Sequence, residues 1–136
     1  SFQLPEGEAP MFKSLSVFQT AHAMAQHAGA RQAVTARNVA NADTPGFQAR
    51  HIASFAETFQ ARQMSKMQTT RAGHMSAKAT GASAESRPSA SQPSPNGNSV
   101  SIEEEILNAV NINREHTRAL AVYRHGMTML RSALGR

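Results

Sequence analysis

Large apolar side chains recur with a helical period over the last third of the chain. Their spacing alternates between four and three residues, which places them on one helix face as in a coiled-coil seam. The positions are Ile102, Ile106, Ala109, Asn113, His116, Leu120, Tyr123, Met127, Leu130 and Leu134, and only Asn113 and His116 are polar. The pattern predicts a helix from Ile102 to about Ala133, about 48 Å long at about 1.5 Å per residue.

The start of this helix is also marked. Ser101 and Glu104 occupy the first and fourth positions of a capping box, in which each side chain accepts a hydrogen bond from a backbone amide of the other end of the box. Glu103 and Glu105 add further negative charge at the positive end of the helix dipole. We therefore expect Ser101 to be the N-cap.

A second helical period occupies residues 12–41. Its face is made mostly of small side chains, so another helix can approach closely, but a helix standing alone buries little there. The face consists of Phe18, Ala21, Ala25, Ala28, Gln32, Thr35 and Val39. We expect the two terminal helices to form a coiled-coil-like, antiparallel pair, with neighbouring subunits covering the sides that the pair leaves open.

The first helix must end before Pro45 and Gly46. Proline sets φ at the first central position of a type II turn, and glycine supplies the positive φ at the second. Thr44 precedes the proline and is therefore disfavoured in the helical region. Asn38 and Asn41 are expected to bond carbonyl groups that lack partners at the helix end.

A short third helix and a long linker are expected between the terminal helices. Ser54 and Glu57 match a second capping box, and an apolar face follows, which predicts a helix from about Phe55 to Met64. Residues 65–98 are rich in Ser, Ala, Thr, Gly, Gln and Pro and should form a flexible or irregular linker. Met67 and Met75, with Met64 before them, are its only sizeable apolar side chains. We interpret them as ordinary linker residues, and docking on a partner is the alternative. The fold class is mainly α.

The composition indicates a chain that needs partners. Aromatic residues make up 5% of it and Trp is absent, and the large apolar residues lie near the two ends. The chain alone is therefore expected to bury too little apolar surface to offset its ordering entropy. The formal net charge of +5 comes from scattered Lys and Arg residues, which is typical of a solvated basic surface.

No pattern predicts catalysis, a cofactor or a metal site. The chain has no cysteine, which excludes disulfides, thiolate zinc sites and a cysteine nucleophile. No two of the six histidines stand three or four residues apart, and there is no Gly-rich phosphate loop. Neither a membrane-spanning apolar run nor a Sec-type signal peptide is expected. Residues 1–10 are interpreted as an N-terminal extension or a tag remnant.

Ten consecutive residues resemble the N-terminal signature of flagellar rod, hook and hook-associated proteins, which usually reads Asn-Ile-Ala-Asn, two variable residues, then Thr-Pro-Gly-Tyr. They are Asn38, Val39, Ala40, Asn41, Ala42, Asp43, Thr44, Pro45, Gly46 and Phe47. Residues 96–105 and 129–134 are similar to the short proximal rod proteins of this family. His116 departs from it, since many members carry a tyrosine there. The resemblance covers about residues 11–59 and 96–136.

The resemblance implies a structural subunit of the flagellar basal-body rod. Such subunits polymerise through their terminal helices into a tube around the export channel, span the periplasm and transmit torque. They are exported by the flagellar type III system without a cleaved signal. The implied partners are other copies of the chain, the adaptor FliE, the rod protein FlgC and other rod subunits, together with the MS-ring and the export gate.

Two sets of residues are expected to act in assembly, the first from the resemblance and the second from the helical spacing. An assembly motif comprises Asn38, Asn41, Asp43, Thr44, Pro45, Gly46 and Phe47. A helix-packing seam comprises Phe18, Val39, Ile102, Ile106, Leu120, Tyr123, Met127, Leu130 and Leu134. The expected segments are residues 1–10, the N-terminal helix, turn and short helix at 11–64, the linker at 65–98, and the C-terminal helix at 99–136.

Two hypotheses from other classes stay open at this stage. The first is a basic helical protein that binds nucleic acid through a disordered arm. Its support is the net charge and the residues Arg31, Arg37, Arg50, Arg62 and Arg71. The second is a helical adaptor or chaperone for export, which should fold as a monomer.

Overall fold

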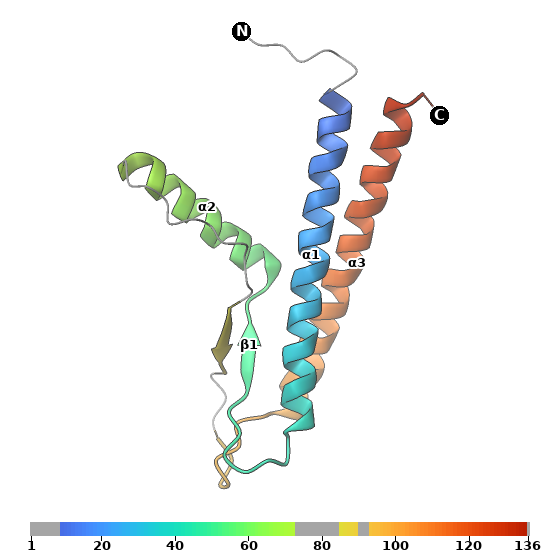
Figure 1. Ribbon diagram of the computed structural model, residues 1–136. Coiled ribbons are helices and arrows are strands. Elements are labelled where there is room, and N and C mark those ends of the chain that lie inside the picture. Colours follow the sequence, from blue (N-terminus) through green and yellow to red (C-terminus); the bar gives the residue numbers. More distant parts are fainter. Residues whose placement is uncertain (1–8, 73–84, 90–92, 136) are drawn as a thin grey trace. The chain divides into compact units, whose positions relative to one another are not determined.

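The computed structural model describes residues 9–72, 85–89 and 93–135, and these parts are mainly helical (Figure 1). The helices are α1 (Ala9–Ala40), α2 (Phe55–Ala72) and α3 (Ile102–Ala133). The strands are β1 (Arg50–Ile52) and β2 (Ser86–Pro88). The expected fold class is confirmed, with two long terminal helices that pack together and a shorter helix between them.

The predicted helix starts are confirmed by their capping hydrogen bonds. The amide of Glu104 donates to Ser101 Oγ at 3.4 Å at the start of α3. The amide of Glu57 donates to Ser54 Oγ at 3.3 Å at the start of α2. These hydroxyl groups satisfy amides in the first turn that have no partner inside the helix.

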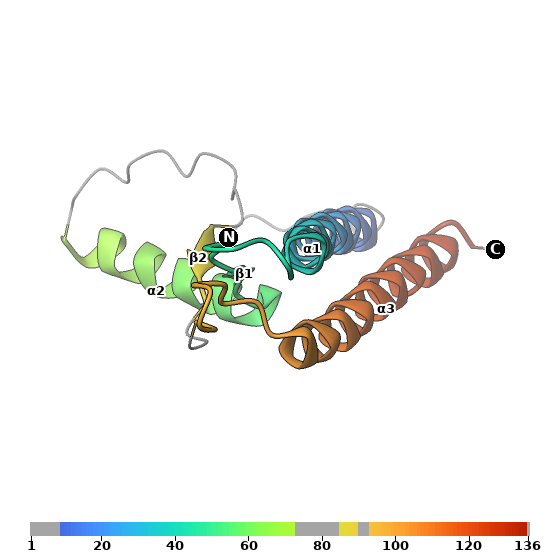
Figure 2. The same cartoon turned by 90° about the horizontal axis from the view of Figure 1, so that it is seen from below.

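Two described parts of the predicted linker form regular secondary structure. Helix α2 runs to Ala72 and does not end near Met64. Its second half lacks an apolar stripe, but it contains neither Pro nor Gly and is rich in good helix formers, which maintain the helix. The linker also contains β2, which pairs antiparallel with β1 in the register His51 to Arg87 (Figure 2). Met75 lies outside the described residues.

The chain divides into two compact units. In the first unit, the part of α1 up to Ala28 packs against the part of α3 from Asn111 onward. Positions of low exposure repeat at intervals of seven residues on both helices, and most carry small side chains. They are Ser14, Ala21 and Ala28 on α1, and Ile112, Ala119 and Gly126 on α3. Small side chains at this spacing allow the two helix backbones to approach closely.

Gly126 marks a point of close approach in the first unit. A Cβ atom at this position would lie 3.1 Å from side-chain atoms of both Val17 and Phe18. The Phe18 ring also lies 5.3 Å from the ring of Tyr123, centroid to centroid. Pairing of residue 18 with residues 123 and 126 fits the expected antiparallel direction of the two helices.

The second unit, Gly29–Val110, contains the end of α1, the strands, α2 and the start of α3. Its buried side chains include several polar ones, among them Asn38 and Glu105, each only 1% exposed. Buried polar groups of this size persist in proteins only when they are hydrogen-bonded. The second unit is therefore organised around a polar network and not around a large apolar core.

Many of the large apolar side chains of the described residues are exposed to solvent. Exposed examples on the terminal helices, or directly after α3, include Met11, Phe12, Leu15, Val39, Ile102, Ile106, Leu107, Val110, Leu120, Tyr123 and Leu134. A soluble monomer usually hides most such residues, and a contiguous exposed set indicates an interaction surface. The distribution supports the expectation that partners complete the apolar packing.

The seam residues of α3 differ from the residues of α3 that are most buried in the single chain. The low-exposure line of α3 runs through Glu105, Ile112, Ala119 and Gly126, one residue before the seam positions. Seam residue Leu120 is 57% exposed, whereas Met127 and Leu130 are half-buried. The seam therefore borders the intramolecular contact and leaves most of its apolar surface open.

Candidate assembly site

Asn98 joins the assembly motif to the segment that precedes α3. Its side chain is only 2% exposed. Nδ2 donates to three backbone carbonyl oxygens just beyond the end of α1. The acceptors are Asn41 at 2.9 Å, Ala42 at 3.0 Å and Thr44 at 2.6 Å. One amide group thus serves carbonyl groups that no longer have partners inside the helix.

Further hydrogen bonds fix the orientation of Asn98. Its Oδ1 accepts from the backbone amide of Val100 at 2.8 Å, and its backbone amide donates to Asn96 Oδ1 at 3.0 Å. The two backbones also bond directly. Gly46 N donates to Asn96 O at 3.0 Å, and Ser99 N donates to Phe47 O at 3.0 Å. The two segments that carry the family resemblance therefore interlock, although about 50 residues separate them.

Two glycines allow this approach. Gly46 has φ +74° and Gly97 has φ +81°, values that disfavour any residue with a Cβ atom. The amide of Phe47 donates to Thr44 O at 3.3 Å, which closes the predicted type II turn around Pro45. A Cβ atom on Gly97 would lie 3.4 Å from the Cα atom of Gly46, so the two turns are in contact.

We predict that Gly97→Ala lowers the free energy of unfolding by about 1–2 kcal/mol, because a residue with a Cβ atom resists the left-handed conformation. Gly29→Ala is the matched control, because Gly29 lies within α1 and a Cβ there meets nothing within 4 Å. The control should gain up to about 1 kcal/mol from helix propensity. Denaturant unfolding followed by circular dichroism measures both, and equal stability of the two variants would contradict the prediction.

Asn38 binds the start of β1 in place of a neighbouring strand. Its Nδ2 donates to Arg50 O at 2.7 Å, and its Oδ1 accepts from Arg50 N at 3.2 Å. The amide thereby satisfies both backbone groups of one residue. The expectation that Asn38 bonds carbonyls at the helix end is therefore incorrect. Asn41 Nδ2 donates to Arg37 O at 2.8 Å, a carbonyl near the helix end that also accepts from the backbone amide of Asn41 at 3.2 Å.

Glu105 on α3 connects Asn38 and His51 to this helix. Its Oε1 accepts from Asn38 Nδ2 at 3.0 Å and lies 2.7 Å from Nε2 of His51 on β1. Its Oε2 is buried without a hydrogen-bond partner. Ser99 adds a second link, because its Oγ accepts from Ala49 N at 2.8 Å. We call Asn38, His51, Asn98, Ser99 and Glu105 the polar clasp.

The polar clasp holds the assembly motif rigidly and turns part of it outward. Asn38 is buried, and Asn41 and Phe47 are half-buried. The exposed members of the motif are Asp43, Thr44, Pro45 and Gly46. A hydrogen-bonded polar network of this kind favours one arrangement of the chain, because other pairings leave more buried groups unsatisfied than the single Glu105 oxygen. The hydrogen bonds of Asn98 therefore favour a single conformation of the turn.

Four members of the polar clasp were missed as contacts from the sequence. Glu105 was assigned only to the helix dipole, and Asn98 and Ser99 only to the segment before the cap. His51 carried no pattern at all. A usable signal existed for Glu105, which stands seven residues before the buried Ile112 and therefore on the same line of α3.

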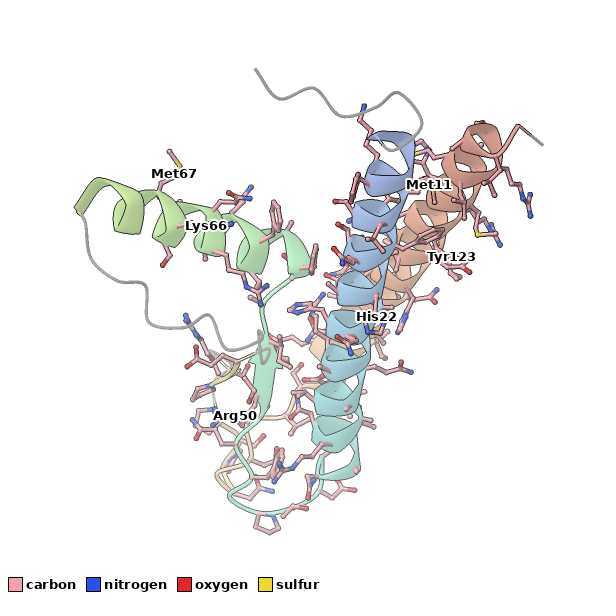
Figure 3. All side chains as sticks on the ribbon, turned by 45° about the horizontal axis from the view of Figure 1, so that its top comes forward. Met11, His22, Arg50, Lys66, Met67 and Tyr123 are labelled. Carbon is pink, nitrogen blue, oxygen red and sulfur yellow. The ribbon has the colours of Figure 1, made fainter. Side chains whose placement is uncertain are left out.

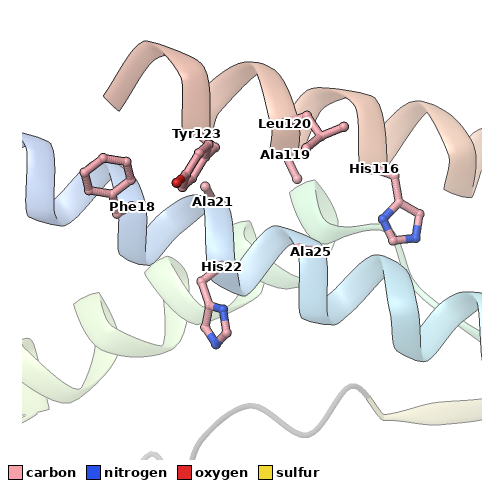
Figure 4. A pocket seen from close by; sticks show the side chains of 8 residues that line it. All are labelled: Phe18, Ala21, His22, Ala25, His116, Ala119, Leu120 and Tyr123. Carbon is pink, nitrogen blue, oxygen red and sulfur yellow. The ribbon is translucent and has the colours of Figure 1, made fainter. Parts of the chain in front are cut away.

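The first unit has a shallow groove between α1 and α3. Its lining is mostly apolar and comprises Phe18, Ala21, His22, Ala25, His116, Ala119, Leu120 and Tyr123 (Figure 4). Across the parts of the chain that are described, no three His, Asp or Glu side chains are grouped to hold a metal ion. None of the helices described has the length and hydropathy that crossing a membrane requires.

Comparison with known families supports one interpretation of this geometry. Residues 20–48 match the flagella basal body rod protein family. The matched rod-family segment covers most of α1 and the turn, including Asn38 and the carbonyls bound by Asn98. This rod family is structural and is not an enzyme family. A search of curated proteins finds no match.

Proposed function

We propose that this chain is a structural subunit of the flagellar basal-body rod. The observation that carries the proposal is that the rod-family match at residues 20–48 ends in the part of the chain held by the polar clasp, from Asn38 to Phe47. The exposed apolar residues of α1 and α3 supply the second support, since they need covering by neighbours. The rod family also supports a location in the basal body.

Within the rod we propose a proximal subunit most like FlgB, with FlgC as the nearest alternative. The support is the segment at residues 96–105, which resembles the corresponding FlgB segment and forms one side of the polar clasp. The assembly motif and Asn98 act together in this proposal. The rigid turn sets the direction in which each helix pair is offered to the next subunit.

The proposed mechanism is helix-on-helix polymerisation. Each copy offers the helix-packing seam beside an intramolecular contact that is already formed, so neighbouring copies bury the seam without unfolding the pair. Repetition builds a tube around the export channel, and close packing of stiff helices lets the tube transmit torque. Proposed partners are further copies of the chain, FliE, FlgC and other rod subunits, with the MS-ring and export gate at the base.

We further propose that the chain reaches this position through the flagellar type III export system, without a cleaved signal, and spans part of the periplasm. The expected result is that a tagged chain co-purifies with detergent-extracted basal bodies and that deleting its gene abolishes swimming. A chain absent from basal bodies that binds DNA with a steep salt dependence would instead favour the nucleic-acid hypothesis.

A further inference from the structure

We propose that α2 of one copy docks on the first half of α3 of a second copy. The inference rests on the proposed function only in taking the chain to assemble with itself. It assigns a role to α2, whose last eight residues fall in the predicted linker, and it gives the assembly a direction.

Helix α2 has an apolar side that the chain leaves open. Phe59 is 49% exposed, Met64 66% and Met67 60%. Their spacing over two turns places them along one broad side of the helix. The ring of Phe59 is stacked on Phe55 with centroids 6.1 Å apart, and Figure 3 shows Met67 projecting away from the ribbon. Exposed apolar side chains of this size on one broad side of a helix favour docking against a second apolar surface.

The first half of α3 has a matching apolar side. Its exposed residues are Ile102, Ile106, Leu107 and Val110. They share a side of the helix away from Glu105, which is 1% exposed and faces the polar clasp. The contact with α1 therefore cannot extend to cover them, and a second chain can reach them.

The charged residues beside the two apolar sides favour docking of α2, and not of a second α3, on this side of α3. Arg62 and Lys66 stand one turn apart on α2 beside Phe59, and both are exposed. Glu103 and Glu104 stand beside the apolar side of α3, and both are exposed. Basic residues beside one stripe and acidic residues beside the other give electrostatic complementarity between unlike surfaces. Pairing either surface with its own copy would bring like charges together.

The docking is therefore heterologous. Each copy offers α2 to one neighbour and the start of α3 to another. After two copies have bound, each therefore still has one surface to which a further copy can bind. A heterologous contact that does not close into a ring propagates as an open helical filament. A rod is an assembly of this kind.

A charge exchange between two chains tests the docking. One chain carries Arg62→Glu and Lys66→Glu, and the other carries Glu103→Lys and Glu104→Lys. Each chain alone should self-associate at least about tenfold more weakly than the unchanged protein in sedimentation velocity, because like charges then face each other. An equal mixture should recover association, since each altered surface finds its complement on the other chain.

Two controls separate this result from loss of folding. Glu103→Gln with Glu104→Gln removes the charges at the start of α3 without reversing them and should give an intermediate association. Arg118→Glu reverses an exposed charge on a side of α3 away from the helix-packing seam and should leave association unchanged. A chain that carries all four substitutions provides a further comparison. If association recovers in that chain but not in the mixture of the two double variants, the contact forms within one copy, and the proposal is overturned.

Cross-linking gives a second measurement, because the chain has no cysteine of its own. Chains carrying Met64→Cys and Leu107→Cys, with different tags, should form a mixed disulfide on mild oxidation. A Gln19→Cys chain in place of the Leu107→Cys chain should not. No mixed disulfide, or equal yield with Gln19→Cys, overturns the docking. If no mixed disulfide forms but the chain is present in basal bodies, the docking is wrong and the rod function stands. If the mixed disulfide forms but the chain is absent from basal bodies, only the rod function is refuted.

Discussion

Asn98→Ala should release the turn at the end of α1 and lower the free energy of unfolding by about 2–4 kcal/mol. The substitution removes the two N–H donors that Nδ2 shares among three carbonyl oxygens, and one accepted bond, at about 1 kcal/mol each. Asn41 O and Thr44 O keep backbone donors, whereas Ala42 O loses the donor that Asn98 supplies. Hydrogen exchange at the amides of Gly46 and Ser99 provides a local readout. Their exchange should accelerate by about 30-fold or more.

Two further variants make this prediction specific to the chemistry of the amide. Asn98→Asp keeps the size and the acceptor for Val100 but directs a carboxylate toward three carbonyl oxygens, so it should destabilise at least as much as alanine. Asn96→Ala removes the side-chain acceptor of one bond and should cost only about 0.5–1.5 kcal/mol. If Asn98→Ala costs no more than Asn96→Ala, Asn98 does not hold the clasp as described.

Leu120→Asp should abolish motility while leaving the chain folded. Leu120 is 57% exposed in the single chain, so a carboxylate there stays in water until assembly begins. Burying it against a neighbouring helix would then place an unpaired charge in an apolar contact, which costs several kcal/mol at each interface. Swimming assays and the recovery of basal bodies measure assembly, and circular dichroism measures folding.

Ala121→Asp is the matched control for Leu120→Asp. It introduces the same charge at the next position of α3, which is also exposed but lies off the helix-packing seam. Motility should persist in this variant. Normal swimming with Leu120→Asp, or equal loss with Ala121→Asp, would show that the seam is not an interface.

The terminal helices and their caps could be predicted because their signals are local. The spacing from Ile102 onward and the capping box at Ser101 together gave the observed bounds of α3. The turn at Pro45 and Gly46 was equally predictable, since its chemistry is confined to four residues. Helix α2 was predicted too short because its second half is held by helix propensity and not by an apolar stripe.

The polar clasp could not be predicted because its contacts are distant in sequence. Nothing in the residues around Asn98 indicates that its amide reaches carbonyls more than 50 positions earlier. The pairing of β1 with β2 is invisible for the same reason. The intramolecular line of α3 was also missed, since it runs through small or polar residues such as Ala119 and Glu105. The larger seam residues beside it dominate the hydrophobic pattern.

A reconstruction of isolated basal bodies by electron cryo-microscopy tests the central claim most directly. The account predicts density in the proximal rod for repeated pairs of long antiparallel helices, with residues 38–47 and 96–105 in contact at one end of each pair. Leu120 should lie against a neighbouring subunit there. Basal bodies whose rod layers are fully occupied by other chains would contradict the claim that this protein is a rod subunit.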